Sequence, residues 1–424
     1  MRILFVLLTL LTTSLVAAQQ NGSESTNSAT PYSFFGLGEL RPQGTIANRS
    51  MGGMSTYNDS IRVNLVNPAA YADLRLTNFA VGATHRELKF TEDGGGEAKT
   101  STTNVEYLAI GVPLGEGMGF GFGLKPFTSV GYNITDLNDP TRVSEYSGSG
   151  GINIVYAGFG IRLFDGFSVG VNADYNFGNI ENKTRVIQDQ VQFGTREFNR
   201  SDISGFSFTL AANYQRVIRE DGLKLFSSFV YVPQNTLDSE NFRTRGTFGF
   251  GLLGNEVPVD ERTIDVPDSK LTIPSRVTFG LGIGEERKWY VGAEYTHEAT
   301  SNFESRTTII ANQNFVDSGR WRAGGFYIPR YNDITNYFNR VVYRGGLRFE
   351  NQGIEINGEE ISEYGISLGL GLPVGKSRSF SNINVGFEYG QRGTTDSGLI
   401  REDFFSISLG LSFTDKWFQK TLFN

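Results

Sequence analysis

An alternation of apolar residues with small or polar residues, at a period of two, recurs along most of this chain. Near the C-terminus it puts Phe405, Ile407 and Leu409 on one face and Ser406 and Ser408 on the other. Successive side chains of a β-strand point to opposite faces, so this period predicts strands and not helices. One face is uniformly apolar, which is typical of a strand that borders lipid or a hydrophobic core.

The alternation predicts fourteen strands, most of them ten or more residues long. Strands of soluble proteins usually have about five or six residues, and single-chain bacterial barrels have an even number of strands. Tight turns, such as 115–117 and 164–166, alternate with long connections, such as 128–151 and 181–202. This layout predicts an all-β fold, a transmembrane antiparallel β-barrel, and disfavours a soluble β-sandwich, whose strands also alternate. The predicted strands are 77–90, 103–114, 117–127, 152–163, 166–179, 203–217, 222–235, 275–285, 287–299, 316–329, 340–350, 362–373, 381–391 and 402–413.

Two details follow from this scheme. The tight turns fall on the side of the barrel where the chain enters and leaves it, which predicts that both termini are periplasmic. Residues 236–274 are expected to form one large outer loop, although Phe248, Phe250 and Leu252 would also fit a strand that extends beyond the membrane.

The first 18 residues read as an export signal. Arg2 precedes an apolar run from Ile3 to Leu11, and small residues end at Ala18, where cleavage is expected. The run is shorter than the roughly 20 residues that a transmembrane helix needs. The chain of 424 residues has no cysteine, which excludes disulfides, thiolate metal sites and a lipidated cysteine. Its acidic balance, a net charge of -7, argues against a nucleic-acid partner. The expected location is the bacterial outer membrane, with its lipid and lipopolysaccharide as partners.

The region before the first strand lacks the alternation. It nevertheless carries apolar residues, among them Phe34 and Phe35, that have nothing to pack on unless they enter the barrel. Fourteen strands enclose a lumen too wide for the wall's own side chains to fill. We therefore predict a signal peptide (1–18), an N-terminal plug or hatch inside the lumen (19–76), the barrel (77–414) and a short periplasmic tail (415–424). The alternative for the plug is a periplasmic docking arm.

Glycines follow one face of the third predicted strand, at Gly117, Gly119, Gly121 and Gly123. Glycine in a strand often marks the close approach of another backbone or of a ligand, and it also serves simply to bend a barrel wall. Our hypothesis is that this strand bends away from a neighbour and leaves a lateral gap through which an apolar substrate reaches the bilayer.

A turn-forming triplet, Asn67-Pro68-Ala69, precedes the first strand. Proline restricts both its own conformation and that of the residue before it, so the triplet predicts a fixed bend. On the gating hypothesis this bend anchors the end of the plug, while the part around Phe34 and Phe35 stays free to move. The alternative is a purely structural bend.

Taken together, the segment MGGMSTYNDSIRVNLVNPAAYADL (51–74), the strands IPSRVTFGLGIG (273–284) and KWYVGAEY (288–295), and the glycine-aromatic strands resemble the FadL/TodX-like family of long-chain fatty-acid transporters. The resemblance implies fourteen strands, an N-terminal hatch and passage of hydrophobic molecules through an opening beside a kinked third strand. Pro126, after the glycine run, stands at the matching place. Some relatives of this barrel type serve as partners in protein secretion.

Three arginines of the eleventh strand, Arg340, Arg344 and Arg348, are expected to point into the lumen. Their side chains suit either a clamp for a substrate carboxylate or structural ion pairs with carboxylates such as Glu294 and Glu388. The only two histidines are His85 and His297, and no orienting acid shares a face with His297. We therefore expect no catalytic residue, no metal site, no cofactor and no enzymatic activity.

The sequence thus predicts a plug-gated outer-membrane channel for hydrophobic small molecules, similar to long-chain fatty acids, with lateral exit near the third strand. The alternative is an accessory barrel subunit of an outer-membrane protein secretion or assembly complex, in which case other outer-membrane proteins would be partners.

Overall fold

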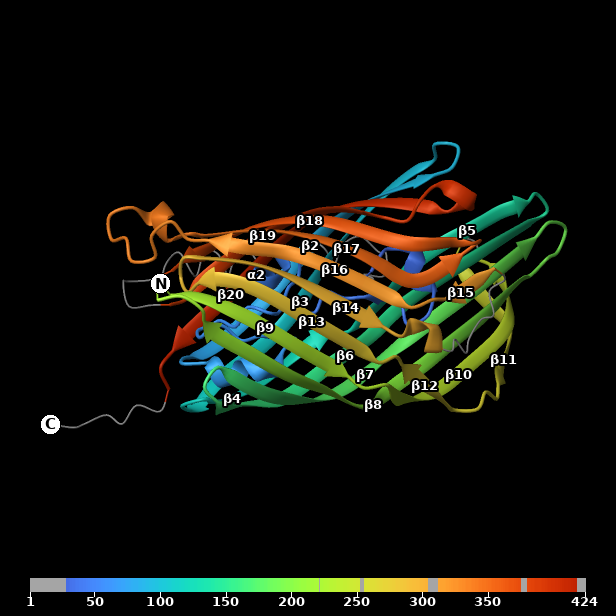
Figure 1. The fold of residues 1–424 in the computed structure, drawn as a ribbon. Helices are drawn as coiled ribbons and strands as arrows, with labels where there is room; N and C mark the ends of the chain where they lie inside the picture. The colour runs from blue at the N-terminus through green and yellow to red at the C-terminus, as the bar shows by residue number, and fades with distance from the viewer. Residues whose placement is uncertain (1–27, 221, 252–254, 304–311, 375–379, 418–424) are drawn as a thin grey trace, which may run out of the picture.

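The computed structural model describes residues 28–417, apart from 221, 252–254, 304–311 and 375–379. The described chain forms a closed antiparallel barrel of fourteen strands (Figure 1). The barrel closes where β2 pairs with β20, with Thr77 opposite Asp415 at one end and Glu92 opposite Ile400 at the other. The predicted all-β barrel is therefore confirmed. The predicted signal peptide (1–18) and most of the predicted tail lie outside the described residues.

Several of the fourteen strands are interrupted and consist of two or three β-segments in line. These are β4 with β5, β9 with β10, β11 with β12 and β13, and β15 with β16. The barrel segments are β2 (Thr77–Glu92), β3 (Glu97–Gly115), β4 (Met118–Pro126), β5 (Thr128–Asp139), β6 (Arg142–Phe164), β7 (Phe167–Gln188), β8 (Gly194–Val217), β9 (Leu223–Val232), β10 (Asn235–Phe250), β11 (Glu256–Ile264), β12 (Ser269–Ile273), β13 (Arg276–Glu285), β14 (Trp289–Glu298), β15 (Gln313–Phe315), β16 (Ser318–Tyr327), β17 (Val342–Ile356), β18 (Glu359–Pro373), β19 (Asn382–Arg392) and β20 (Ile400–Asp415).

The outer surface of the wall is apolar, as the period of two predicts. On β20, Phe405, Ile407 and Leu409 are exposed, while Ser406 and Ser412 are buried on the inward face. The same alternation holds on β4. A soluble sandwich would bury its apolar face, whereas this wall turns it outward, as a lipid-facing surface requires.

Residues 236–274 are not a loop, which corrects the prediction for this region. They form β10, β11 and β12, because β10 pairs with β8 along residues 238–248 and with β11 and β12 on its other edge. Phe248 is fully buried on β10 and Phe250 ends that strand, whereas Leu252 lies outside the described residues. The predicted long connections 128–151 and 181–202 are likewise mostly strands. The outward residues of these strand ends include charged ones, such as Arg200 and Asp202 of β8. The apolar alternation therefore stops before the hydrogen-bonded pairing of the strands does.

The two ends of the barrel differ. We call the end with Thr77 and Asp415 the terminal end; it carries tight turns such as Gly115 to Met118, and a long loop, residues 328–341. The opposite end carries the extended hairpins of β7 with β8 and β10 with β11 (Figure 1). Among the described residues, no helix is long and apolar enough to cross a membrane.

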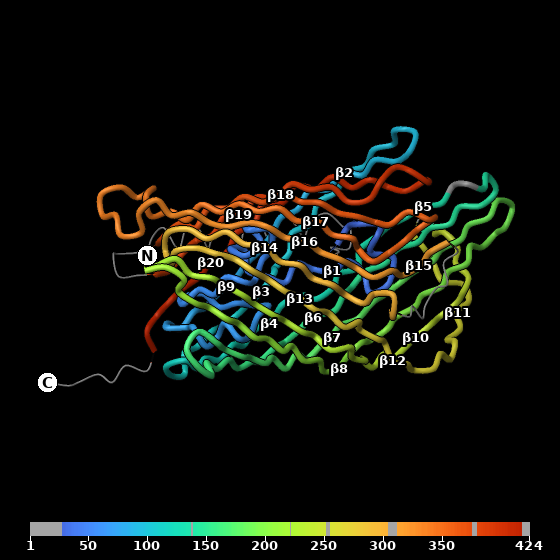
Figure 2. The backbone as a smooth tube through the Cα atoms, in the orientation of Figure 1, coloured from blue at the N-terminus to red at the C-terminus, as the bar shows by residue number. Residues whose placement is uncertain are grey.

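Residues 28–76, here called the N-terminal segment, run inside the barrel (Figure 2). The segment contains η1 (Pro31–Phe34), β1 (Glu39–Leu40), α2 (Ile46–Arg49) and η2 (Pro68–Asp73). Its helix α2 lies against β18, β19 and β20, and η2 lies against β4, β6, β7 and β8. Ile46, Leu65 and Tyr71 of this segment share a buried cluster with Tyr107 and Tyr156 of the wall.

Candidate functional site

The third barrel strand, made of β4 and β5, loses its pairing with β3 part of the way along. β4 pairs with β3 on one side as far as Leu124 and with β6 on the other as far as Pro126. Beyond it, β5 keeps pairing with β6, but its other edge pairs with β1, where Glu39 and Leu40 lie opposite Ser129 and Thr128. Within the described residues, no register joins β5 to β3. The N-terminal segment therefore takes the place of a wall strand here.

A β-bulge on β3 faces this break. Gly82 of β2 lies opposite Tyr107, but the next residue, Ala83, lies opposite Val105, so Glu106 is the extra residue. A bulge re-aims the side chains that follow it. As a result both Glu106 and Tyr107 are buried inside the barrel, while Val105 is exposed on its outer surface.

The carboxylate of Glu106 binds two arginines of the N-terminal segment. It accepts hydrogen bonds from Arg41 Nη2 at 2.7 Å and from Arg49 Nη2 at 3.1 Å. All three side chains are largely shielded from solvent. Charge-assisted hydrogen bonds of this kind are stronger than neutral ones, so the bulge ties the segment to the wall beside the break.

A second cluster centres on Glu39 of β1. Its Oε1 atom accepts from Arg86 Nη1 and from Arg392 Nη2, each at 2.8 Å, and Arg41 lies 3.8 Å from its other oxygen. Burial by itself would raise the pKa of the Glu39 carboxyl, but the charges of Arg392, Arg86 and Arg41 outweigh it and hold that pKa well below its usual range. Arg392 also binds Glu363 and lies near Glu402, which continues the network along the wall.

A third contact holds the middle of the N-terminal segment. Glu294 of β14 accepts hydrogen bonds from the backbone N–H of Ser55 at 2.8 Å and from the Thr56 hydroxyl at 3.0 Å. Arg322 Nη1 of β16 donates to the other carboxylate oxygen, Glu294 Oε1, at 2.9 Å. The segment is thus joined to the wall by charged groups at several depths.

Arg344 and Arg348 of β17 are on the inward face, as predicted, whereas Arg340 is not part of the strand and ends η4 (Tyr337–Arg340). Arg348 forms ion pairs with Glu388 at 2.7 Å and with Glu350 and Glu363, which favours the structural alternative over a substrate clamp. Arg344 is buried and donates to Asn384 Oδ1 at 3.1 Å, and its Nη2 atom has no hydrogen-bond partner among the described residues.

The glycines of the third strand lie beneath Tyr71 of η2. A β-carbon on Gly119 would meet the Tyr71 backbone oxygen at 2.0 Å, and one on Gly121 would meet its ring at 2.4 Å. Gly123 faces Tyr156 in the same way, and Gly117 belongs to the turn before β4. This corrects the hypothesis that the strand bends away at these glycines. β4 is paired on both edges there, and its glycines make room for η2. The pairing with β3 ends after Leu124 instead.

The triplet 67–69 caps η2. The Asn67 side chain accepts from the backbone N–H of Ala69 at 3.1 Å, and Pro68 occupies the first position of the 3-10 helix. The Asn67 amide also donates to Asn213 of β8 at 2.7 Å. Ala69 is fully buried. The triplet therefore forms a bend that is hydrogen-bonded to the wall.

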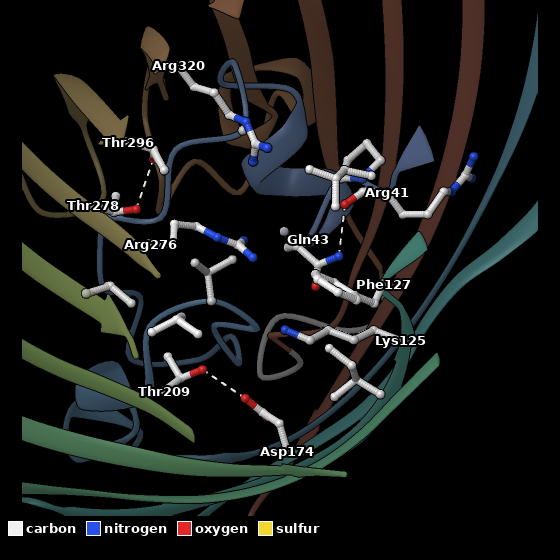
Figure 3. Close-up of a pocket in the computed structure, with 18 of the residues that line it drawn as sticks. Arg41, Gln43, Lys125, Phe127, Asp174, Thr209, Arg276, Thr278, Thr296 and Arg320 are labelled. Atoms are coloured by element: carbon white, nitrogen blue, oxygen red, sulfur yellow. Dashed lines mark hydrogen bonds between the residues drawn. The ribbon is translucent and has the colours of Figure 1, made fainter. Parts of the chain in front are cut away.

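A cavity of about 130 Å³ remains at the centre of the lumen (Figure 3). Cationic residues that line it outnumber acidic ones by seven to three. Lys125 points into it and donates to the Leu65 backbone oxygen at 2.9 Å, and Asp174 accepts from Thr209 at 2.8 Å. Such a lining favours anions or water and disfavours an uncharged apolar molecule.

A second cavity, of about 200 Å³, opens toward the opposite end; aromatic rings form one side of it, and polar side chains such as Asn182, Glu197 and Asn199 line the rest. The Phe34 ring packs edge-on against Tyr132 of β5, with 5.0 Å between ring centroids. The centroid of the Phe34 ring lies 6.3 Å from that of Tyr146 of β6 and 5.3 Å from that of Phe35. Phe303 lines the same space. The predicted residues Phe34 and Phe35 are therefore together in one pocket, and they are separate from the glycines and from Arg344 and Arg348.

Sequence reasoning missed the acidic residues that organise the site, Glu39 and Glu106. Glu39 stands in a two-residue strand, which is too short to show an alternation. Glu106 falls on the predicted outward face, and nothing in the local pattern reveals the bulge that turns it inward. An unexplained acidic residue on an otherwise apolar face, next to Tyr107, is the one signal that was available.

The fold is that of FadL-like outer-membrane barrels, which confirms the resemblance at the level of the fold. The chain is similar to the monoaromatic hydrocarbon channel CymD, with 12% identity, a TM-score of 0.55 and coverage of 90% of this chain and 99% of that one. It is similar to a Pseudomonas aeruginosa FadL homologue at 14% identity and a TM-score of 0.56, covering 90% and 98% of the two chains. It is also similar to the P. putida toluene transporter TodX, at 15% identity and a TM-score of 0.55, with coverage of 89% of this chain and 100% of that one.

The sequence model of one family, described as BamG, matches residues 1–424. The chain belongs to the BamG family. No curated protein matches it.

Proposed function

We propose that this protein is an outer-membrane channel for uncharged or weakly polar hydrophobic molecules, with the terminal end in the periplasm and the outer-membrane lipid around its apolar belt. The observation that carries the proposal is the parting of β5 from β3, where the N-terminal segment replaces the wall. The aromatic pocket of Phe34 and Phe35 is the loading site, because apolar rings offer a hydrophobic molecule a favourable environment.

The proposed route avoids the centre of the lumen. β5 lines the aromatic pocket with Val130 and Tyr132, and the edge of the same strand that pairs with β1 borders the break. A molecule bound against β5 has to pass only the two residues of β1 to reach the bilayer. The charged cavity around Lys125 lies deeper, and a hydrophobic molecule would lose free energy by entering it.

In this proposal the plug is the N-terminal segment, and its gate is the part from η1 to β1. The part around η2 stays fixed, because Asn67 and Tyr71 hold it against β4 and β8. The solved structures that share the fold include a monoaromatic hydrocarbon channel and toluene transporters, which supports a hydrophobic cargo; the chemical identity of that cargo is left to experiment.

Uptake of a hydrophobic fluorescent probe by proteoliposomes tests the proposal. We expect the parent barrel to accelerate uptake, and Phe34→Ala with Phe35→Ala to reduce it severalfold without loss of the folded barrel. Phe193→Ala, an exposed aromatic residue outside the pocket, is the matched control and should leave uptake unchanged. Equal uptake by the double variant and the parent would overturn the assignment of the pocket.

A second function, that of an accessory barrel subunit in an outer-membrane secretion or assembly complex, is favoured by a different observation. The ion pairs of Glu39, Glu106 and Glu294 fix the N-terminal segment in place, which suits a barrel that does not conduct. On this alternative, proteoliposomes with the parent protein take up the probe no faster than liposomes without protein, and mild-detergent purification yields a stable partner.

A further inference from the structure

One connection at the terminal end differs from the tight turns around it. The loop of residues 328–341 joins β16 to β17 and leaves Ile334 and Phe338 strongly exposed, at 89% and 69% of their surface. Exposed large apolar side chains that stand together outside the lipid belt commonly mark an interaction site.

This loop has a defined structure around Asp333. Its carboxylate accepts hydrogen bonds from the backbone N–H groups of Thr335 and Asn336 at 2.8 and 2.9 Å, and from the Asn339 amide at 2.6 Å. The backbone N–H of Arg330 donates to the Asn339 carbonyl at 2.8 Å and closes the base. The backbone that carries the two apolar side chains is therefore ordered before any partner arrives, which lowers the entropy cost of binding.

Two neighbouring hollows lie between the N-terminal segment and the wall. The first, of about 370 Å³, is lined in part by Tyr331 and Ile334 of the loop, and the second, of about 480 Å³, is lined by wall residues such as Arg162 and Gln215. Tyr57, Ser60 and Glu286 line both of them. Residues of the tight turns at the terminal end, Gly166 in one hollow and Glu286 in both, line them together with the N-terminal segment, which places the hollows at this mouth of the barrel.

The mouth is basic although the chain is acidic. Seven cationic and five acidic residues line the two hollows, whereas the whole chain has a net charge of -7. The acids Asp59, Asp73 and Glu286 each have a cationic partner within 4 Å. Among the arginines that line the hollows, Arg62 and Arg162 are paired in this way, and the other four form no ion pair within 4 Å with a described residue, namely Arg75, Arg216, Arg287 and Arg340.

We propose that the loop 328–341 and the two hollows form a docking site for an acidic segment of a periplasmic protein. Ile334 and Phe338 anchor apolar side chains of that partner, and the four arginines receive its carboxylates. Complementary charge gives such a contact its orientation, and a few central apolar residues give it most of its affinity. The inference goes beyond channel activity and holds whether or not the barrel conducts.

Photo-crosslinking in cells tests this proposal with the full-length protein. A photoreactive residue at exposed Asn332 should give one discrete adduct, and the cross-linked stretch of the partner should carry more Asp and Glu than Lys and Arg. A photoreactive residue at Glu116, in the tight turn before β4, is the control site and should give none.

Charge reversal separates this docking from chance proximity. Arg75→Glu with Arg287→Glu should lower the adduct yield at least tenfold, while Arg75→Lys with Arg287→Lys retains it, and Ile334→Ser should lower it severalfold. Absence of an adduct, a basic or neutral cross-linked stretch, or a yield indifferent to the charge reversal would overturn the proposal.

A membrane-bound loop is the competing outcome. Phe338→Trp fluorescence in liposomes with brominated lipid chains should not be quenched, because the loop projects into water. Strong quenching would place the loop in the lipid and would overturn docking to a protein.

Discussion

The ring of Tyr71 lies against Gly121 of β4, so that a β-carbon on Gly121 would come within 2.4 Å of the Tyr71 Cζ atom. Tyr71 is fully buried and comes from the N-terminal segment, while Gly121 belongs to the wall. The glycine face of β4 is therefore the surface on which η2 packs, and a side chain there must displace the segment.

The first prediction concerns the packing of η2 on this surface. Gly121→Ala should destabilise the barrel by about 1–3 kcal/mol through overpacking, as measured by urea unfolding in detergent. Tyr71→Ala should remove most of that cost in a double-mutant cycle. Gly119→Ala is the contrast, because its β-carbon would meet the Tyr71 backbone oxygen at 2.0 Å, so Tyr71→Ala should not rescue it. Equal rescue at both positions would contradict the packing described.

The second prediction concerns the lipid-facing belt. Leu409→Arg should cost about 2–4 kcal/mol if Leu409 lies near the bilayer midplane, because the charge faces hydrocarbon. Phe413→Arg, on the same face but nearer the end of β20, should cost less. Folding titrations into lipid vesicles measure both. A larger cost at Phe413 would show that the belt is centred elsewhere.

A feature of the fold or of the site could be predicted from the sequence where it depends on neighbouring residues, and could not where it depends on residues far apart in the chain. The faces of β20 and β4 follow from a local period, and the structure confirms them. The strands within 236–274 were missed because their outward residues are charged, so the pairing with β8 continues without an apolar pattern. The pairing of Glu39 with Ser129 and the bulge at Glu106 depend on partners far along the chain, and no local pattern encodes them.

The third prediction tests the Glu39 cluster. Glu39→Gln should loosen the N-terminal segment by about 3 kcal/mol, since removing one partner leaves Arg86 and Arg392 buried beside a neutral group. Limited proteolysis of the segment in the folded barrel provides the measurement. Glu87→Gln, on the exposed face of β2, should leave the cleavage rate unchanged.

The same cluster predicts a pH dependence. The pKa of Glu39 is depressed in the folded protein, so its stabilising effect is complete above the unfolded pKa of about 4.3 and is lost only as the pH falls toward the lower folded pKa. Protease resistance of the segment should therefore stay constant from about pH 8 to pH 5 and decline below about pH 4. A decline already between pH 7 and pH 6 would mean that another group controls the segment.

The fourth prediction concerns Asp333. Hydrogen bonds from Asn339, Asn336 and Thr335 hold the pKa of its carboxyl well below the usual range, so the carboxylate stays ionised at any physiological pH. Asp333→Ala should accelerate amide hydrogen exchange in 333–340 and leave exchange in the barrel strands unchanged. Unchanged exchange in the loop would show that other contacts shape it.

The most direct test of the proposed channel is a reversible lock across the break. The chain has no cysteine, and Leu40 of β1 lies directly opposite Thr128 of β5, so Leu40→Cys with Thr128→Cys should form a cross-strand disulfide. Val385→Cys with Leu409→Cys, a directly opposed pair between β19 and β20, is the control. If the gate lies at this break, oxidation of the first pair stops uptake of a hydrophobic probe into proteoliposomes, reduction restores it, and the control pair has no effect. Equal uptake by the oxidised and the reduced forms of the first pair would contradict the account.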